Sequence, residues 1–416
     1  MESILYLTHR IPFPPNKGDK VRSFNLLRFL CKRYRVHLGT FVDDAADLEY
    51  IPELERMCAS FKAITLRPAF ARLRSAVGFW TGEALTLPYY RNAALTEWID
   101  RVLRDHSISK AIVFSSAMAQ YVLERRELRL VVDFVDVDSA KWDQYSRSRP
   151  WPIASIYGRE GRRLLAFERV VAARAHASVF VTKAEATLFC KLAPECASAV
   201  HHAQNGVDTD YFAPDAMRAN PFGPDEDAIV FTGAMDYWPN IDAVTWFASD
   251  VMPRIVAKRP NAHFYVVGMQ PAPAVMALDR DPNITVTGLV PDTRPYLQHA
   301  HVVVAPLRVA RGIQNKVLEG MSMGRPVVVS AGAAEGIHAR HGIDLEVAAD
   351  AGEFATKSLA LMDDGPRRRR MGEAARARVV AAYSWAANLL PFASLLEGDI
   401  TGQPVAGDGR GYIHRA

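Results

Sequence analysis

The chain has 416 residues, of which 49% are hydrophobic and 23% charged; this length suits two domains of about 150–200 residues. No apolar run approaches the roughly 20 residues of a membrane-spanning helix, and a net charge of +4 suits an anionic substrate or membrane surface but not nucleic acid. The four cysteines lack the spacing of a zinc site or disulfide framework, so we expect reduced thiols, no metal, no cofactor and a cytoplasmic protein.

The first residues predict a strand over Ser3–Thr8, a proline-rich loop and then a helix, rather than a signal peptide. Gly18 lies in that loop, where a backbone can approach a ligand closely, and Arg22 follows near the start of the helix. Later apolar runs predict further strands, over 36–42, 111–115, 130–135 and 178–182. Strands that alternate with helical segments indicate a doubly wound α/β domain.

The segment 67–91 is basic and aromatic, with Glu83 as its only acid. Such a stretch can lie in a membrane interface, or it can pack on the core with its arginine stems along the surface. Our hypothesis is the first alternative, with Arg72, Arg74, Phe79 and Trp80 as acceptor or membrane contacts.

Two acids, Asp136 and Asp138, follow the strand predicted at 130–135. Ligands of open α/β sheets bind at the carboxyl ends of strands, so either acid is a candidate catalytic group. The same acids can instead fix the turn or cap the next helix.

The second half begins after an Asn205-Gly206 turn and a Pro/Asp/Gly-rich stretch, which we interpret as a linker over 208–227. Strands are predicted over 228–232, 263–267 and 284–286. The predicted domains are therefore 1–207 and 228–384, followed by a helix at 385–398 and a mobile tail at 399–416.

The segment 302–330 predicts strand Val302–Ala305, a loop, a helix over 313–323 that ends at Gly324, and strand Val327–Ser330. Free N–H groups at the start of such a helix bind anions. Gly312 allows close approach there, and Arg311 and Lys316 add positive charge. Asn315 and Glu319 lie one turn apart, where a carboxylate suits sugar hydroxyls. An ordinary crossover with a solvated polar face is the alternative.

This segment resembles the donor-site motif of the retaining GT-B glycosyltransferases of family 4. Glu319 matches the second glutamate of that motif, and Gly324-Arg325-Pro326-Val327-Val328 matches its strand entry. The first glutamate falls at Arg311, and this departure, with Gln314-Asn315-Lys316, resembles the sugar transferases of exosortase (PEP-CTERM)-associated exopolysaccharide loci.

The resemblance implies two Rossmann-like α/β domains facing across a cleft, with the last helix crossing back to the first domain. It implies retaining, metal-independent transfer of a hexosyl group from a nucleotide diphosphate-sugar. The acceptor would be a lipid-linked exopolysaccharide intermediate at the inner face of the cytoplasmic membrane. A nucleotide-sugar epimerase and a non-catalytic sugar-nucleotide binding or assembly subunit are the alternatives.

The resemblance also implies residue roles. Glu319 would hold the donor ribose, and Asp136 or Asp138 the reacting sugar or the acceptor hydroxyl. The loop 233–240 lacks the arginine and lysine that clamp the diphosphate in the family, so we expect the clamp at 311–316. The donor-binding residues would be Gly18, Gly233, Gly268, Leu289, Arg311, Gly312, Gln314, Asn315, Lys316, Glu319 and Glu335.

Overall fold

The computed structural model describes residues 1–15, 18–147, 150–310 and 313–398. The chain divides into two compact units, one of Met1–Asn205 with the chain from Asn388 onward, the other of Gly206–Ala387. The predicted tail, Arg311 and Gly312 lie outside the described residues.

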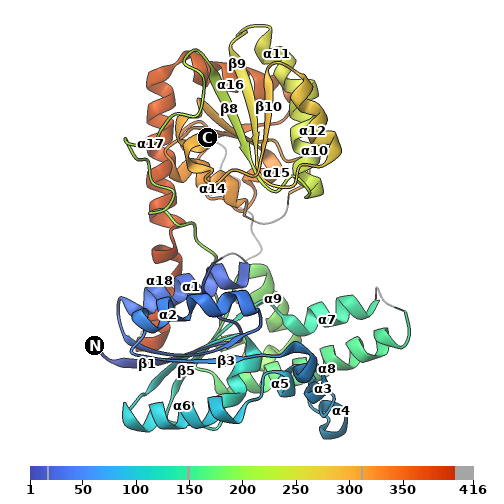
Figure 1. The fold of residues 1–416 in the computed structure, drawn as a ribbon, viewed down its shortest axis with the longest axis vertical. Coiled ribbons are helices and arrows are strands. Elements are labelled where there is room, and N and C mark those ends of the chain that lie inside the picture. The colour runs from blue at the N-terminus through green and yellow to red at the C-terminus, as the bar shows by residue number, and fades with distance from the viewer. Residues whose placement is uncertain (16–17, 148–149, 311–312, 399–416) are drawn as a thin grey trace. The chain divides into compact units, whose positions relative to one another are not determined.

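The first unit is built on a seven-stranded parallel sheet with the order β3-β2-β1-β4-β5-β6-β7 (Figure 1). Its strands are β1 (Ser3–Thr8), β2 (Arg35–Val42), β3 (Ser60–Thr65), β4 (Lys110–Phe114), β5 (Arg129–Val135), β6 (Ala177–Phe180) and β7 (Val200–His202). Because the chain passes from β1 to β2 on one side and returns to β4 on the other, the order reverses between β1 and β4. Ligands of such sheets bind at the carboxyl ends beside this reversal.

Helices with one apolar face cover this sheet. α6 shows the cause: the Asn92 side chain caps its first turn, and Leu95, Ile99 and Val102 form its buried stripe. The helices are α1 (Gly18–Cys31), α2 (Ile51–Met57), α3 (Pro68–Ser75), α4 (Gly78–Thr81), α5 (Thr86–Tyr89), α6 (Ala93–Asp105), α7 (Asp138–Arg147), α8 (Ile153–Arg174), α9 (Lys183–Leu192) and the end of α18 (Trp385–Glu397). α7 and α8 pack side by side (Figure 1).

A buried ion pair joins α1 to β5 in this unit. The Arg22 guanidinium donates to both carboxylate oxygens of Asp133, at 2.8 and 3.1 Å, and to the Ala203 carbonyl at 2.8 Å. Both side chains are at most 1% exposed. Arg22 therefore ties the β1–α1 region to the sheet.

The second unit has a six-stranded parallel sheet with the order β10-β9-β8-β11-β12-β13. Its strands are β8 (Asp227–Thr232), β9 (Ala262–Val267), β10 (Ile284–Gly288), β11 (Val302–Ala305), β12 (Val327–Ser330) and β13 (Glu346–Ala348). Its main helices are α10 (Trp238–Trp246), α11 (Met252–Val256), α12 (Pro273–Met276), α13 (Arg294–His299), α14 (Asn315–Ser322), α15 (Ala331–Ala334), α16 (Ala351–Asp363) and α17 (Gly365–Ala382). The order reverses between β8 and β11, so the loops after these two strands flank the expected ligand position.

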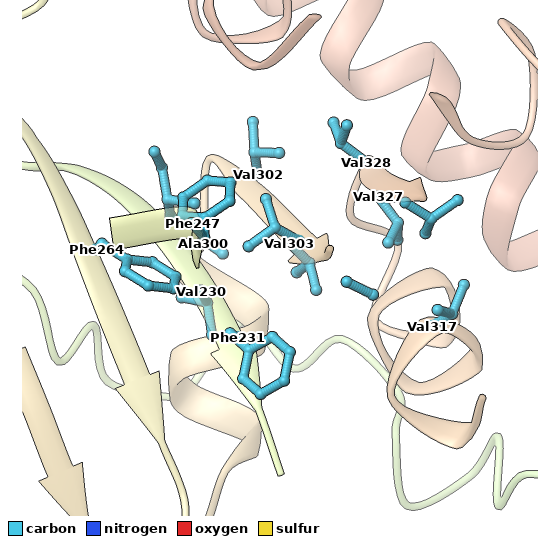
Figure 2. Packing of buried hydrophobic residues seen from close by; sticks show 14 of the residues in the cluster. Val230, Phe231, Phe247, Phe264, Ala300, Val302, Val303, Val317, Val327 and Val328 are labelled. Carbon is cyan, nitrogen blue, oxygen red and sulfur yellow. The ribbon is translucent and has the colours of Figure 1, made fainter. Parts of the chain in front are cut away.

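The core of this unit gathers apolar side chains from β8, β11, β12 and α14. Figure 2 shows Phe231, Val303, Val317 and Val327 in one cluster, and all four are at most 1% exposed. The valine runs are buried on both faces, as central parallel strands are. The predicted class of two parallel-sheet α/β domains is confirmed for each unit.

The stretch 208–227, predicted as a linker, belongs to the second unit. Phe222 is 9% exposed and packs against the rings of Tyr265 and Tyr296, at centroid distances of 4.6 and 5.9 Å. Its apolar ring gives this stretch a place in the core of the second unit, although its Pro/Asp/Gly composition suggested a free connection.

Candidate functional site

A cavity of about 530 Å³ opens in the second unit at the carboxyl ends of β8 and β9 and the start of α14. This is the position that the reversal between β8 and β11 predicts. Its walls comprise Thr232, Gly233, Ala234, Tyr237, Asn240, Val267, Gly268, Met269, Leu289, Val290, Thr293, Ile313, Gln314, Asn315, Lys316 and Glu319. Such a volume suits a small-molecule ligand, since the pockets that bind small molecules have volumes of roughly 300–1,000 Å³.

Two glycines bring the strand ends of this cavity together. A Cβ on Gly268 would lie 1.7 Å from the carbonyl oxygen of Gly233, and Gly268 has a φ of +155°. A Cβ on Gly233 would lie 2.7 Å from the Asn240 side chain and 3.0 Å from the Lys316 ammonium. Only glycine fits at position 268, and a side chain at position 233 would displace the Asn240 and Lys316 side chains, so bare backbone forms this part of the wall.

Lys316 points from the first turn of α14 toward the loop after β8. Its ammonium donates to the Asn240 amide oxygen at 2.5 Å and lies 4.1 Å from the centroid of the Phe231 ring. Asn240 donates in turn to the Ala234 carbonyl at 2.8 Å. The ammonium thus lies beside the N-terminal turn of α14, and the N-terminal end of a helix binds phosphate groups.

Lys316 and Glu319, three residues apart along α14, each affect the pKa of the other. Burial lowers the pKa of Lys316 to about 7, and the charge of Glu319 opposes this shift. Burial raises the pKa of Glu319 to about 7, and Lys316 opposes that shift. A bound anion would favour the charged ammonium and raise its pKa.

The structure brings most of the predicted donor residues into this one cavity. The residues that share it are Gly233, Gly268, Leu289, Gln314, Asn315, Lys316 and Glu319. Glu335 is exposed after α15 and is not among the residues that line the cavity, so the structure does not bring it together with the others. Gly18 begins α1 in the first unit.

Asn240, Tyr237 and Thr293 line the cavity and were missed as site residues. Asn240 is six residues from the backbone carbonyl that it contacts and 76 from Lys316. A polar amide among the apolar residues at the start of α10 was the available signal.

Asp136 and Asp138 lie at the carboxyl end of β5 in the first unit, and both bind one ammonium. Lys141 Nζ is 2.8 Å from Asp136 and 3.0 Å from Asp138. Burial by itself would lower the pKa of Lys141, but the charges of Asp138 and Asp136 outweigh this effect and raise the pKa. Val135 just before them has a φ of +67°, which is strained for a β-branched residue.

His9, which the sequence analysis did not identify as a site residue, lies at the end of β1. His9 Nε2 is 3.5 Å from Asp19, which also accepts from Arg10 at 2.8 Å. Burial by itself would raise the pKa of Asp19, but the hydrogen bond from His9 and the charge of Arg10 outweigh this effect and lower the pKa. Nδ1 of His9 is buried, with no hydrogen-bond partner among the described residues. His9 and Asp136 thus follow β1 and β5, which are both neighbours of β4.

The basic, aromatic segment forms α3, α4 and α5. Arg72, Phe79 and Trp80 are exposed. Arg74 is also exposed and donates to the carbonyls of Pro88 and Tyr89 at 2.7 Å each. Its guanidinium therefore holds α3 against α5, and its membrane contact remains a prediction. None of the helices in the described ranges is both long and apolar enough to cross a membrane.

Comparison with known proteins identifies the type of the second unit. Residues 226–364 match the family described as Glycosyl transferases group 1. The second unit carries a group 1 glycosyltransferase domain. The GDP-mannose-dependent monoacylated alpha-(1-6)-phosphatidylinositol monomannoside mannosyltransferase of Corynebacterium glutamicum is 30% identical over 147 residues, which are 32% of this chain and 38% of that relative.

Solved structures resemble both units of the chain. HepE of Anabaena, in complex with UDP and glucose, is 14% identical with a TM-score of 0.59, over 96% of this chain and 100% of that one. Sucrose-phosphate synthase of Thermosynechococcus elongatus is 17% identical with a TM-score of 0.59, over 96% and 99%. At this identity the likeness establishes the fold, which is GT-B.

Proposed function

We propose that the protein transfers a hexosyl group, with retention and without a metal ion, from a nucleotide diphosphate-sugar. The observation that carries the proposal is the placement of Lys316 and Glu319 in one cavity at the start of α14. The ammonium and the helix N–H groups would bind the diphosphate and stabilise it as it leaves. Glu319 would accept hydrogen bonds from the ribose hydroxyls, in keeping with the motif that it matches.

The comparisons support a sugar-nucleotide donor. HepE was solved with UDP and glucose, and the Corynebacterium relative is named as dependent on GDP-mannose. Each of these cases combines a nucleoside diphosphate and a hexose, as separate molecules in the HepE complex and as one in GDP-mannose. The Lys316–Glu319 cavity suits that chemistry.

We propose further that the acceptor is lipid-linked, an exopolysaccharide intermediate met at the inner face of the cytoplasmic membrane. Exposed Phe79 and Trp80 beside Arg72 support this, because apolar side chains with nearby arginines bind anionic lipid surfaces. The name of the Corynebacterium relative, which contains an acylated phosphatidylinositol, is also consistent with a lipid acceptor. Asp136 or Asp138 would contact the acceptor hydroxyl or the reacting sugar.

The test is turnover. The full chain is incubated with UDP-, GDP- and dTDP-sugars, with and without membrane lipid extract, and the released nucleoside diphosphate and labelled lipid are measured. Lipid-dependent release with sugar transferred to lipid supports the proposal. Conversion of the donor to an epimer without lipid would identify an epimerase, and donor binding without turnover would identify an assembly subunit.

A further inference from the structure

A second cavity lies in the first unit, between the α3–α5 segment and the paired helices α7 and α8. It has a volume of about 360 Å³, within the range of roughly 300–1,000 Å³ for ligand pockets. Its apolar and aromatic walls include Leu85, Tyr89, Tyr90, Trp142, Ile156 and Tyr157. The rings of Trp142 and Tyr157 meet edge to face at 5.0 Å, which fixes one wall.

The carboxylate of Glu160, the one acidic group among the described residues that line this cavity, already has hydrogen-bond partners. Glu160 is 2% exposed and accepts from the N–H groups of Leu85 and Thr86, at 2.6 and 3.0 Å, and from the Thr86 hydroxyl at 2.7 Å. These bonds satisfy its oxygens and hold the start of α5 on α8. The remaining surface is mainly hydrocarbon and aromatic ring, which favours an apolar ligand.

The helices around the cavity also expose apolar side chains to solvent. Trp80 on α4 is 85% exposed, and Trp151 just before α8 is 81% exposed. The Arg159 guanidinium of α8 lies 5.0 Å from the Phe79 ring and donates to the Glu83 carbonyl at 3.2 Å. α4 is therefore in contact with α8, so exposed Trp80 lies on a helix that packs against a wall helix of the cavity.

The other side of the cavity adjoins the polar residues at the strand ends. Trp142 follows Asp138 by four residues, so both lie on one face of α7. The Tyr90 ring is 5.9 Å from the ring of His9 at the end of β1. Tyr90 therefore borders both the apolar cavity and the polar strand ends.

We propose that this cavity binds the hydrocarbon chain of a lipid next to its polar head, so that the head group lies toward Asp138 and His9. The inference rests on the proposed function, since the lipid would be the acceptor. The cavity is an apolar site separate from the exposed side chains proposed to contact the membrane. The exposed apolar side chains would contact the membrane, and the cavity would take the chain of a single lipid molecule.

The test uses the full chain and a dansyl-labelled undecanoic acid, kept below its micelle concentration, with fluorescence as the readout. Ile156 is part of the cavity wall yet 38% exposed, so Ile156→Trp can fill the cavity from the helix surface. We expect saturable binding by the wild type and binding at least about tenfold weaker in Ile156→Trp. The matched control is Val170→Trp, on the same helix at a position 58% exposed and outside this cavity, which should bind as the wild type does.

The proposal is overturned by no saturable binding in the wild type, by equal binding in Ile156→Trp, or by displacement of the probe by methyl glucoside rather than by unlabelled fatty acid. Trp80→Ser should lose binding to anionic vesicles and keep binding to the soluble probe. Loss of both would also count against a separate cavity.

Nucleotide binding is measured on the same samples. Probe binding without nucleotide binding would contradict the donor site alone, and the reverse would contradict the lipid cavity alone.

Discussion

The ammonium of Lys316 is bonded at 2.5 Å to the amide oxygen of Asn240, and so links α14 to the loop after β8. Both side chains line the same cavity. An ammonium has three N–H donors, so donors remain for a ligand oxygen. The pair therefore holds the Lys316 amine in place before any ligand arrives.

Replacing that amine should weaken donor binding. We expect Lys316→Met to raise the Kd for the preferred nucleoside diphosphate at least about tenfold, because a charge-assisted hydrogen bond contributes about 1.5–3 kcal/mol. Isothermal titration calorimetry measures this. Lys357→Met is the control, since Lys357 pairs with Glu353 on α16 and does not line the cavity. A change below about twofold in Lys316→Met would refute the clamp.

Donor affinity should fall as the pH rises. The pKa of Lys316 is lowered to about 7, so without ligand the ammonium is charged below that pH and loses its proton above it. A diphosphate favours the charged form, so binding near pH 8 should take up a proton, and Kd should increase from about pH 7 to about pH 9. Calorimetry in two buffers of different ionisation enthalpy measures the uptake. The same titration of Lys316→Met should show less of it; an unchanged uptake would assign the proton to another group.

The close approach of Gly268 to Gly233 predicts a severe effect of a single methyl group. Gly268→Ala places a Cβ 1.7 Å from a backbone oxygen. We therefore expect the unfolding free energy to fall by about 3 kcal/mol or more. Gly342→Ala is the control: its φ of +77° is also positive but nothing lies within 4 Å, so only backbone strain of about 1 kcal/mol applies. Urea unfolding followed by circular dichroism compares them. Equal effects would contradict the steric account.

The buried Arg22–Asp133 pair predicts a different pattern. Arg22→Met leaves Asp133 buried without its partner and should cost about 3–5 kcal/mol of unfolding free energy. The double variant Arg22→Met/Asp133→Leu removes both charges and should recover much of this loss. If the double variant loses at least as much unfolding free energy as the two single variants do together, the pair does not stabilise the fold as described.

Local sequence patterns were enough to predict the central strands. β1, β11 and β12 were predicted to the residue, because each is a continuous apolar run beside a loop. β3, β7 and β13 were missed, since SFKAIT, VHH and EVA are short or half-polar and are fixed by their neighbours in the sheet. Gly324 ends α14 with a φ of +66°, as predicted.

The candidate site was predictable only where it is local. Lys316 and Glu319 share one helix, so spacing alone placed them together. Asn240 reaches Lys316 across 76 residues, and only the folded sheet brings the two loops together. His9 was missed for the same reason, because its neighbour Tyr90 lies far along the chain.

The most direct test of the donor site is a thermal-shift panel of UDP, GDP and dTDP, each free and with its common sugars. It uses the wild type, Glu319→Ala and the control Glu335→Ala, whose side chain is exposed outside the cavity. We predict that one nucleotide raises the Tm of the wild type and of Glu335→Ala, and that Glu319→Ala loses the shift. No shift with any nucleotide, or an equal shift in Glu319→Ala, would contradict the assignment of this cavity as the donor site.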